Sequence, residues 1–278
     1  MKVIVPVAVC LMLAGSIVAH DMFLVVPDHD FPPDSSVTIS LYNGTFTKSE
    51  NTIDRDRMTD VTVVDGEGGV AHPDSEQWRD EGNVTILSFD SGASGTHVVG
   101  VSTKPKMIEL SAEDFNEYLE HDGVLDVLAA RQGSGSLGSA ARERYAKHVK
   151  TILQVGEGVT ETWAHRLGYP VEIVPLANPS QLCAGDTLEV EVLAEGEPVP
   201  GQLLYASYEG FDGHDEGGSH REAIATRTDV EGVGQIELVK AGRWYVRLIR
   251  MLESPDEEVE YESNWATLTF EANCAKGD

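Results

Sequence analysis

The sequence predicts a mainly β protein built from two antiparallel β-sandwich domains with a small helical insert between them. Short segments that alternate apolar and polar residues, separated by Gly-, Pro- and Asp-rich turns, fill residues 20–110 and return from residue 168. Between these regions the apolar residues change to a helical spacing. We therefore expect an N-terminal sandwich over 20–110, a helical insert over 111–156, and an immunoglobulin-like or prealbumin-like sandwich over 168–274.

The first 19 residues have the order of a secretory signal peptide. Lys2 precedes an apolar run, and small residues follow up to Ala19. The run is shorter than the roughly 20 apolar residues of a transmembrane helix, and no later segment is apolar enough to span a membrane. We predict cleavage before His20, with a cut a few residues earlier as the alternative, and a mature chain in the periplasm or outside the cell. Val9 is a poor residue to precede a lipidated Cys10.

The first region should hold five strands. The clearest alternates Val37, Ile39 and Leu41 on one face. The predicted strands are residues 22–26, 37–44, 61–69, 83–89 and 96–103.

The insert should begin with a helix over residues 111–132. Ser111 suits the N-cap, acidic residues occupy the first turn, and Gly123 is expected to break or bend the helix. A flexible linker is predicted at 133–139, and a second helix at 141–153.

The last region reads as seven short strands separated by turn signals such as Ala184-Gly185-Asp186. This number and spacing are typical of an immunoglobulin-like or prealbumin-like sandwich. The predicted strands are residues 170–176, 187–193, 202–210, 222–229, 234–239, 243–251 and 264–272.

Charge and cysteines narrow the class of protein. The chain has 47 acidic and 20 basic residues and a formal charge of −27. The electric field of this charge repels nucleic acid and anionic membranes and attracts cations. Adaptation to salt, or solubility alone, is the alternative explanation. After export, Cys183 and Cys274 remain, and in an oxidising compartment we expect them to form a disulfide.

His20 is the leading candidate for a metal ligand. At a mature N-terminus it would offer both an α-amine and an imidazole, and one further histidine would complete a three-nitrogen site that favours Cu(II), then Ni(II). The candidate partners are His214 and His220, in an acidic Gly-rich loop over 209–222, and His29 in a Pro/Asp loop. We expect a divalent transition metal: Cu, Ni or Co.

The sequence contains no recognisable catalytic motif. A G-x-S-x-G elbow, an H-E-x-x-H helix and a P-loop are all absent. We therefore expect a protein that is not an enzyme. A copper monooxygenase, which would use the same N-terminal histidine, is the enzymatic alternative.

Several phrases together resemble a bacterial family of exported proteins of unknown function that is catalogued with a nickel-uptake transporter component. They are AHDMFLVVPDHDF (19–31), ERYAKHVKTI (143–152), LGYPVEIVPLANP (167–179), GDTLEVEVLAEGEPVPG (185–201) and TDVEGVGQIELVKAGRWYV (228–246). The second half also resembles the prealbumin or carboxypeptidase-regulatory sandwich. The family resemblance implies metal uptake, with a membrane metal transporter or receptor as partner.

These observations favour a periplasmic protein that takes up, delivers or buffers a metal ion through His20. The alternative is a non-catalytic cell-envelope protein, either structural or ligand-binding. Four tryptophans offer no evident platform for sugar recognition.

Overall fold

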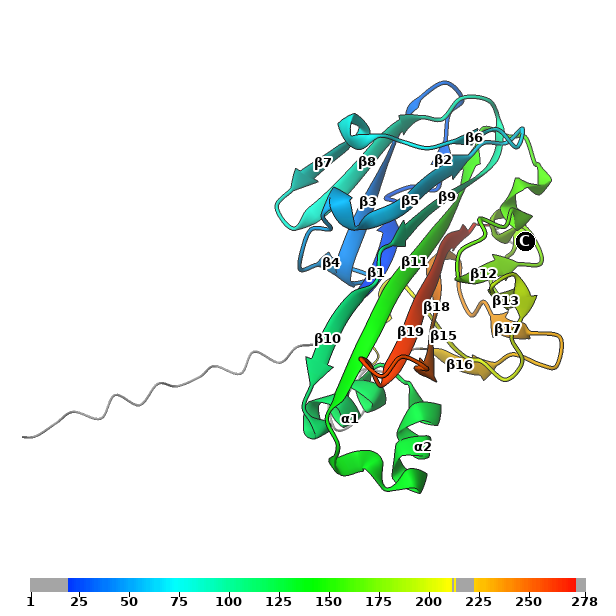
Figure 1. The fold of residues 1–278 in the computed structure, drawn as a ribbon. Coiled ribbons are helices and arrows are strands. Elements are labelled where there is room, and N and C mark those ends of the chain that lie inside the picture. Colours follow the sequence, from blue (N-terminus) through cyan, green and yellow to red (C-terminus); the bar gives the residue numbers. More distant parts are fainter. Residues whose placement is uncertain (1–19, 212, 214–222, 274–278) are drawn as a thin grey trace, which may run out of the picture.

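A computed structural model describes residues 20–211, 213 and 223–273. The chain is mainly β, and its strands form three sheets that are largely antiparallel (Figure 1). This confirms the predicted fold class. One long sheet runs through the middle of the molecule, and a smaller sheet packs against each of its two faces.

The central sheet has the strand order β16-β15-β18-β19-β11-β9-β5-β6, and β10 and β2 also pair with β11. Their bounds are β2 (Asp30–Phe31), β5 (Met58–Val64), β6 (Val70–Ala71), β9 (Gly95–Thr103), β10 (Lys106–Leu110), β11 (Ala141–Val155), β15 (Leu203–Tyr208), β16 (Ile224–Arg227), β18 (Gly242–Glu253) and β19 (Tyr261–Ala272). Strands from residues 20–110 and from residues 168–274 therefore hydrogen-bond within one sheet.

Strand β11 occupies the place where a second helix was predicted, so the prediction of a helix at 141–153 is wrong. Tyr145, Val149 and Ile152 do fit a helical spacing, but they fit a strand buried on both faces equally well. β11 lies between β9 and β10 on one side and β19 on the other, and its pairing with β19 is parallel. Both faces of β11 carry charged as well as apolar residues, for example Lys147 and Val149 on one face and Lys150 and Ile152 on the other. Apolar and polar residues therefore do not alternate along the strand, and its period of two is hidden.

The two outer sheets pack on opposite faces of the central sheet. One contains β1 (Asp21–Val25), β3 (Ser36–Thr45), β4 (Lys48–Ser49), β7 (Trp78–Glu81) and β8 (Val84–Asp90). The other contains β12 (Val171–Pro175), β13 (Thr187–Ala194), β14 (Glu197–Pro198) and β17 (Val233–Glu237). Val149 and Leu153 of β11 belong to the core under the first sheet, whereas Ile152 belongs to the core under the second. Odd and even residues of β11 thus face different layers.

Two helices cover the end of the central sheet, α1 (Ala112–His121) and α2 (Leu125–Ser134) (Figure 1). The Ser111 hydroxyl caps α1 by accepting a hydrogen bond from the Asp114 amide at 3.2 Å, and Gly123 adopts a φ of 75° between the helices. The predicted N-cap at Ser111 and the predicted break at Gly123 are therefore confirmed. Phe115 and Leu119 pack with Trp265 of β19 in a separate core.

The predicted flexible linker at 133–139 is wrong. It contains the end of α2 and a 3-10 turn, and the Arg131 guanidinium fixes this segment by donating to the carbonyls of Ser136 and Ser139 at 3.0 and 2.6 Å. The 3-10 turns of the chain are Arg55–Arg57, Ser75–Gln77, Ser136–Gly138, Glu161–Ala164 and Pro179–Gln181.

Candidate functional site

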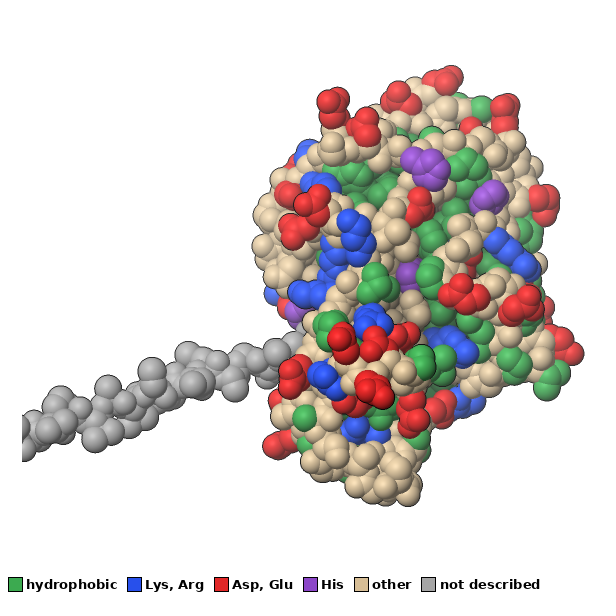
Figure 2. Space-filling model, in the orientation of Figure 1, with side chains coloured by type: hydrophobic (Ala, Val, Ile, Leu, Met, Phe, Trp, Pro, Cys, Tyr) green, Lys and Arg blue, Asp and Glu red, His purple; other side chains and the backbone are tan. Residues whose placement is uncertain are grey.

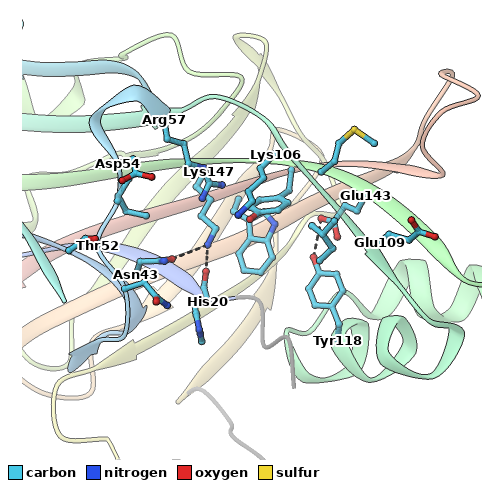
Figure 3. A pocket seen from close by; sticks show the side chains of 16 residues that line it. His20, Asn43, Thr52, Asp54, Arg57, Lys106, Glu109, Tyr118, Glu143 and Lys147 are labelled. Carbon is cyan, nitrogen blue, oxygen red and sulfur yellow. Dashed lines mark hydrogen bonds between the residues drawn. The ribbon is translucent and has the colours of Figure 1, made fainter. Parts of the chain in front are cut away.

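Two cavities meet at His20, on the face of the central sheet that also carries β1 and the helices. The larger, called here the Lys147 cavity, has a volume of about 670 Å³ (Figure 3). The smaller, the His121 cavity, has a volume of about 380 Å³. His20 lines both of them.

Two contacts hold His20 at this junction. Its Nε2 lies 3.1 Å from a carboxylate oxygen of Glu50, and its carbonyl oxygen accepts a hydrogen bond from the ammonium group of Lys147. The His20 side chain is 26 % exposed, so solutes can reach the imidazole. The residue directly after the predicted cleavage position is thus ordered against the body of the protein.

His121 lies in the same cavity as His20. It ends α1, its side chain is about half exposed, and its Nδ1 lies 3.2 Å from an Asp122 carboxylate oxygen. That hydrogen bond raises the pKa of His121 above its usual value. No spacing rule could identify His121 as a neighbour of His20, because the packing of α1 on the sheet creates the shared cavity.

The other predicted metal ligands do not join His20 in the described part of the chain. His29 is buried, lies 3.4 Å from a Glu271 carboxylate oxygen, and lines neither cavity. His214 and His220 lie outside the described residues. Among those described, no group of three or more His, Cys, Asp or Glu side chains is arranged to hold a metal ion. In the described structure, His29 therefore does not complete a site with His20. The same prediction for His214 and His220 stays untested.

The predicted Cys183–Cys274 bridge also reaches outside the described residues. Cys183 is a disulfide-bonded cysteine and is buried, whereas Cys274 is not described. Its pairing with Cys274 stays a prediction.

The floor of the Lys147 cavity is one face of β11. Glu143, Tyr145 and Lys147 alternate along that strand and all line the cavity. The Lys147 ammonium lies 5.0 Å from the centre of the Trp265 ring and 5.7 Å from that of Tyr145. Lys147 is 4 % exposed, and burial lowers its pKa to about 8.

Glu143 lies deeper on the same strand and is 1 % exposed. Its Oε1 accepts hydrogen bonds from the Tyr118 hydroxyl at 3.1 Å and from the Ser263 hydroxyl, whereas its Oε2 is buried without a hydrogen-bond partner in the described structure. Burial raises the pKa of Glu143 to about 7, against the lowering effect of the two hydroxyl donors. This carboxyl group therefore ionises at a higher pH than an ordinary glutamate.

Arg57 enters the cavity from the other side, at the end of a 3-10 turn. Its guanidinium carbon lies 5.1 Å from the centre of the Tyr145 ring, and its Nε and Nη2 are buried without a hydrogen-bond partner in the described residues. Arg55, two residues earlier, instead donates to Asp80 at 2.9 Å. Figure 3 shows Arg57, Lys106 and Lys147 on one side of the cavity and Glu143 and Tyr118 on the other.

No prediction from the sequence pointed to the Lys147 cavity. The signal would have been the spacing of two between Glu143, Tyr145 and Lys147, but a helix over this segment would place Tyr145 on a different face from Glu143 and Lys147.

Acidic residues outnumber basic residues in the whole chain by 47 to 20. Figure 2 shows acidic side chains scattered over the visible face, while the fewer Lys and Arg side chains lie mainly across its middle. The lining of the Lys147 cavity contains three basic side chains, Arg57, Lys106 and Lys147, and three acidic ones, Asp54, Glu109 and Glu143. Basic side chains are therefore more frequent there than in the whole chain, whose formal charge is −27.

Comparison with known families assigns the chain. The model of a domain of unknown function, DUF4198, matches residues 17–251. The chain belongs to this family. The family description names no activity, so the association with nickel uptake stays a prediction.

Comparison with solved structures gives remote likenesses. The D0-D1 domain of intimin matches with 11 % identity over 90 % of this chain and 97 % of that chain, at a TM-score of 0.21. A Salmonella alpha-2-macroglobulin reacted with methylamine matches with 12 % identity over 90 % of this chain, at a TM-score of 0.27, and this chain spans 15 % of its length. The Escherichia coli adhesin FdeC matches with 14 % identity over 92 % of this chain and 64 % of that chain, at a TM-score of 0.23.

No curated protein matches the sequence. At TM-scores this low, the structural likenesses carry no conclusion about function. Within the described ranges, no helix has the length and apolar character needed to cross a membrane.

Another buried histidine, His148, is hydrogen-bonded through both ring nitrogens. His148 Nδ1 lies 2.9 Å from the Ser102 hydroxyl and its Nε2 lies 2.9 Å from the Asn264 side-chain oxygen. Burial lowers the pKa of His148, and the three residues line neither the Lys147 cavity nor the His121 cavity. This arrangement links β9, β11 and β19 and contributes to packing.

Proposed function

We propose that the protein is exported and binds a divalent transition metal ion, Cu, Ni or Co, through His20, in order to take up, deliver or buffer that metal. The observation that carries the proposal is the position of His20: its imidazole shares the His121 cavity with a second imidazole. Removal of residues 1–19 would add an α-amine at the same place. The proposed role is binding and transfer of the ion, without catalysis.

The proposed site has three nitrogen donors. Such a site needs only two imidazoles and one amine, so it does not require three clustered side chains. His20 and His121 would supply the imidazoles, and the Glu50 carboxylate lies 3.1 Å from His20 Nε2. Nitrogen donors favour Cu(II) and Ni(II) over harder cations. The acidic surface would raise the local concentration of the free ion. A membrane metal transporter or receptor is the partner that this role requires.

The alternative is a structural or ligand-binding protein of the cell envelope. It predicts no tight metal site at His20. Metal titration therefore separates the two hypotheses directly.

The test uses a chain that begins at His20 with a free amine, titrated calorimetrically with Cu(II), Ni(II) and Co(II). We expect one tight site, weakened by roughly 100-fold or more in His20→Ala and in His121→Ala, because each variant removes a nitrogen ligand. His72→Ala is the matched control, since His72 is exposed and lines neither cavity. A chain with one glycine added before His20 isolates the contribution of the amine. Unchanged affinity in His20→Ala would refute the assignment.

A further inference from the structure

The Lys147 cavity contains basic groups that lack a carboxylate partner in the described structure. The Lys147 ammonium donates only to neutral acceptors, the carbonyl of His20 and the Asn43 side-chain oxygen at 3.5 Å. Two buried nitrogens of Arg57 have no acceptor at all among the described residues. Both cations lie within 6 Å of the centre of the same ring, that of Tyr145, so they repel one another across it.

This arrangement is costly unless an anion joins it. A buried charge without a counter-charge, or a buried donor without an acceptor, destabilises the folded state. Carboxylates are abundant in this chain, and surface arginines such as Arg55 and Arg142 pair with Asp80 and Glu260. The unpaired cations therefore do not result from a shortage of acidic residues.

The size and lining of the cavity indicate the class of anion. A volume of about 670 Å³ lies within the range of small-molecule sites. Ile108, Met107 and the Trp265 ring supply apolar contact, and the exposed Lys106 adds a third cation. The acidic side chains of the lining are Asp54, Glu109 and Glu143. An inorganic ion would leave most of this space and all of the apolar surface unused.

We propose that the Lys147 cavity binds a small organic carboxylate. Its carboxylate group would lie between Arg57 and Lys106, where a guanidinium can donate two parallel hydrogen bonds to it. Its carbon skeleton would extend over Tyr145 and Ile108 toward the Glu143 side of the cavity. This site differs from the proposed metal site, because its ligand contacts come from β11, β10 and the 3-10 turn at Arg57.

The experiment uses metal-free protein that begins at His20, with citrate, glutamate and succinate as the probes and inorganic phosphate as the simple-anion comparison. Binding is measured by calorimetry and by ligand-observed NMR up to about 10 mM, a limit that still detects affinities in the millimolar range. We expect at least one of the three carboxylates to bind more tightly than phosphate. Metal is absent throughout, so failure of the metal proposal leaves this result unaffected.

Three variants locate the site. Arg57→Gln should weaken carboxylate binding by about 10-fold or more, and Lys106→Gln by several-fold, because each removes a charge-assisted hydrogen bond. Arg55→Gln is the matched control: it lies in the same 3-10 turn, pairs with Asp80 and does not line this cavity. Lys106 is exposed, so its substitution tests the site even where Arg57→Gln proves unstable.

Three outcomes would overturn the proposal. They are the absence of binding by all three carboxylates, phosphate binding as tight as that of the best carboxylate, and carboxylate affinity that Arg57→Gln and Lys106→Gln leave unchanged. Loss of affinity in both of these variants and its retention in Arg55→Gln would support it.

Discussion

Strand β11 carries two buried lysines, three residues apart, in opposite environments. Lys150 faces the sheet that contains β12, where its ammonium lies 2.5 Å from a Glu172 carboxylate oxygen and also donates to the His165 carbonyl at 3.2 Å. Lys147 faces the Lys147 cavity and, among the residues that the structure describes, donates only to neutral oxygens. Burial lowers the pKa of both, but only Lys150 has a counter-charge in contact among the described residues.

The charge of Lys150 stabilises the fold, whereas the charge of Lys147 is available to a ligand. Glu172 also accepts hydrogen bonds from the amides of Leu167 and Gly168 at 2.8 and 3.1 Å, so its buried pair with Lys150 is well satisfied and links two sheets. In the Lys147 cavity, two Arg57 nitrogens and Glu143 Oε2 have no hydrogen-bond partner among the described residues. Unsatisfied polar groups at a cavity are typical of binding sites rather than of structural cores.

The largest effect on stability should come from breaking the buried ion pair between Lys150 and Glu172. Lys150→Met leaves the Glu172 carboxylate buried without its cation, and we expect a loss of about 3–5 kcal/mol in the free energy of unfolding. Urea denaturation measures it. The same substitution at position 147 removes an unpaired charge, so Lys147→Met should change stability by less than about 1 kcal/mol. Equal losses in the two variants would contradict the comparison.

An intermediate effect is expected at Glu143. Its pKa is about 7 in the folded protein, against a usual value of 4.5, so the proton is held more tightly in the folded state. The stability that this proton contributes is complete below pH 4.5, falls as the pH rises and is lost above pH 7, a change of about 3 kcal/mol. Glu143→Gln removes the ionisation, so the variant should be more stable than the parent protein at pH 8 by up to that amount.

At pH 4 the advantage of Glu143→Gln should vanish, because both proteins are then neutral at this position. Urea denaturation from pH 4 to pH 8 checks the trend. Asp122, Lys147 and Tyr118 also interact electrostatically with Glu143 and are retained in the variant. A constant difference between the two proteins across this range would show that Glu143 does not hold a proton in the folded state.

The smallest effect concerns Tyr118. Its hydroxyl donates to Glu143 at 3.1 Å and lowers the pKa of that carboxyl group, so Tyr118→Phe should raise it above 7. The variant should also lose about 1 kcal/mol of stability. Carbon-detected NMR titration of the Glu143 carboxyl measures the pKa. Tyr42→Phe is the control, because Tyr42 lines neither cavity, and it should leave that pKa unchanged.

The local rules worked where a segment carries its own signal. Alternation located β3 and β13, and Ser111 and Gly123 marked the start of α1 and the break before α2. They failed for residues 141–153, since a strand buried on both faces shows no visible alternation of apolar and polar residues. That single error hid the Lys147 cavity, because Tyr145 shares a face with Glu143 and Lys147 only in a strand.

The sequence by itself determined the mainly β class, most of the strands, the first helix and the prominence of His20. Each of these depends on neighbours within a few positions along the chain, where propensity and periodicity act. The tertiary structure alone decided that β11 runs through the centre of the sheet, that His121 shares a cavity with His20, and that Arg57 lies against Tyr145. These contacts join residues that are tens to more than 100 positions apart, and they arise from how the layers pack, which no local pattern encodes.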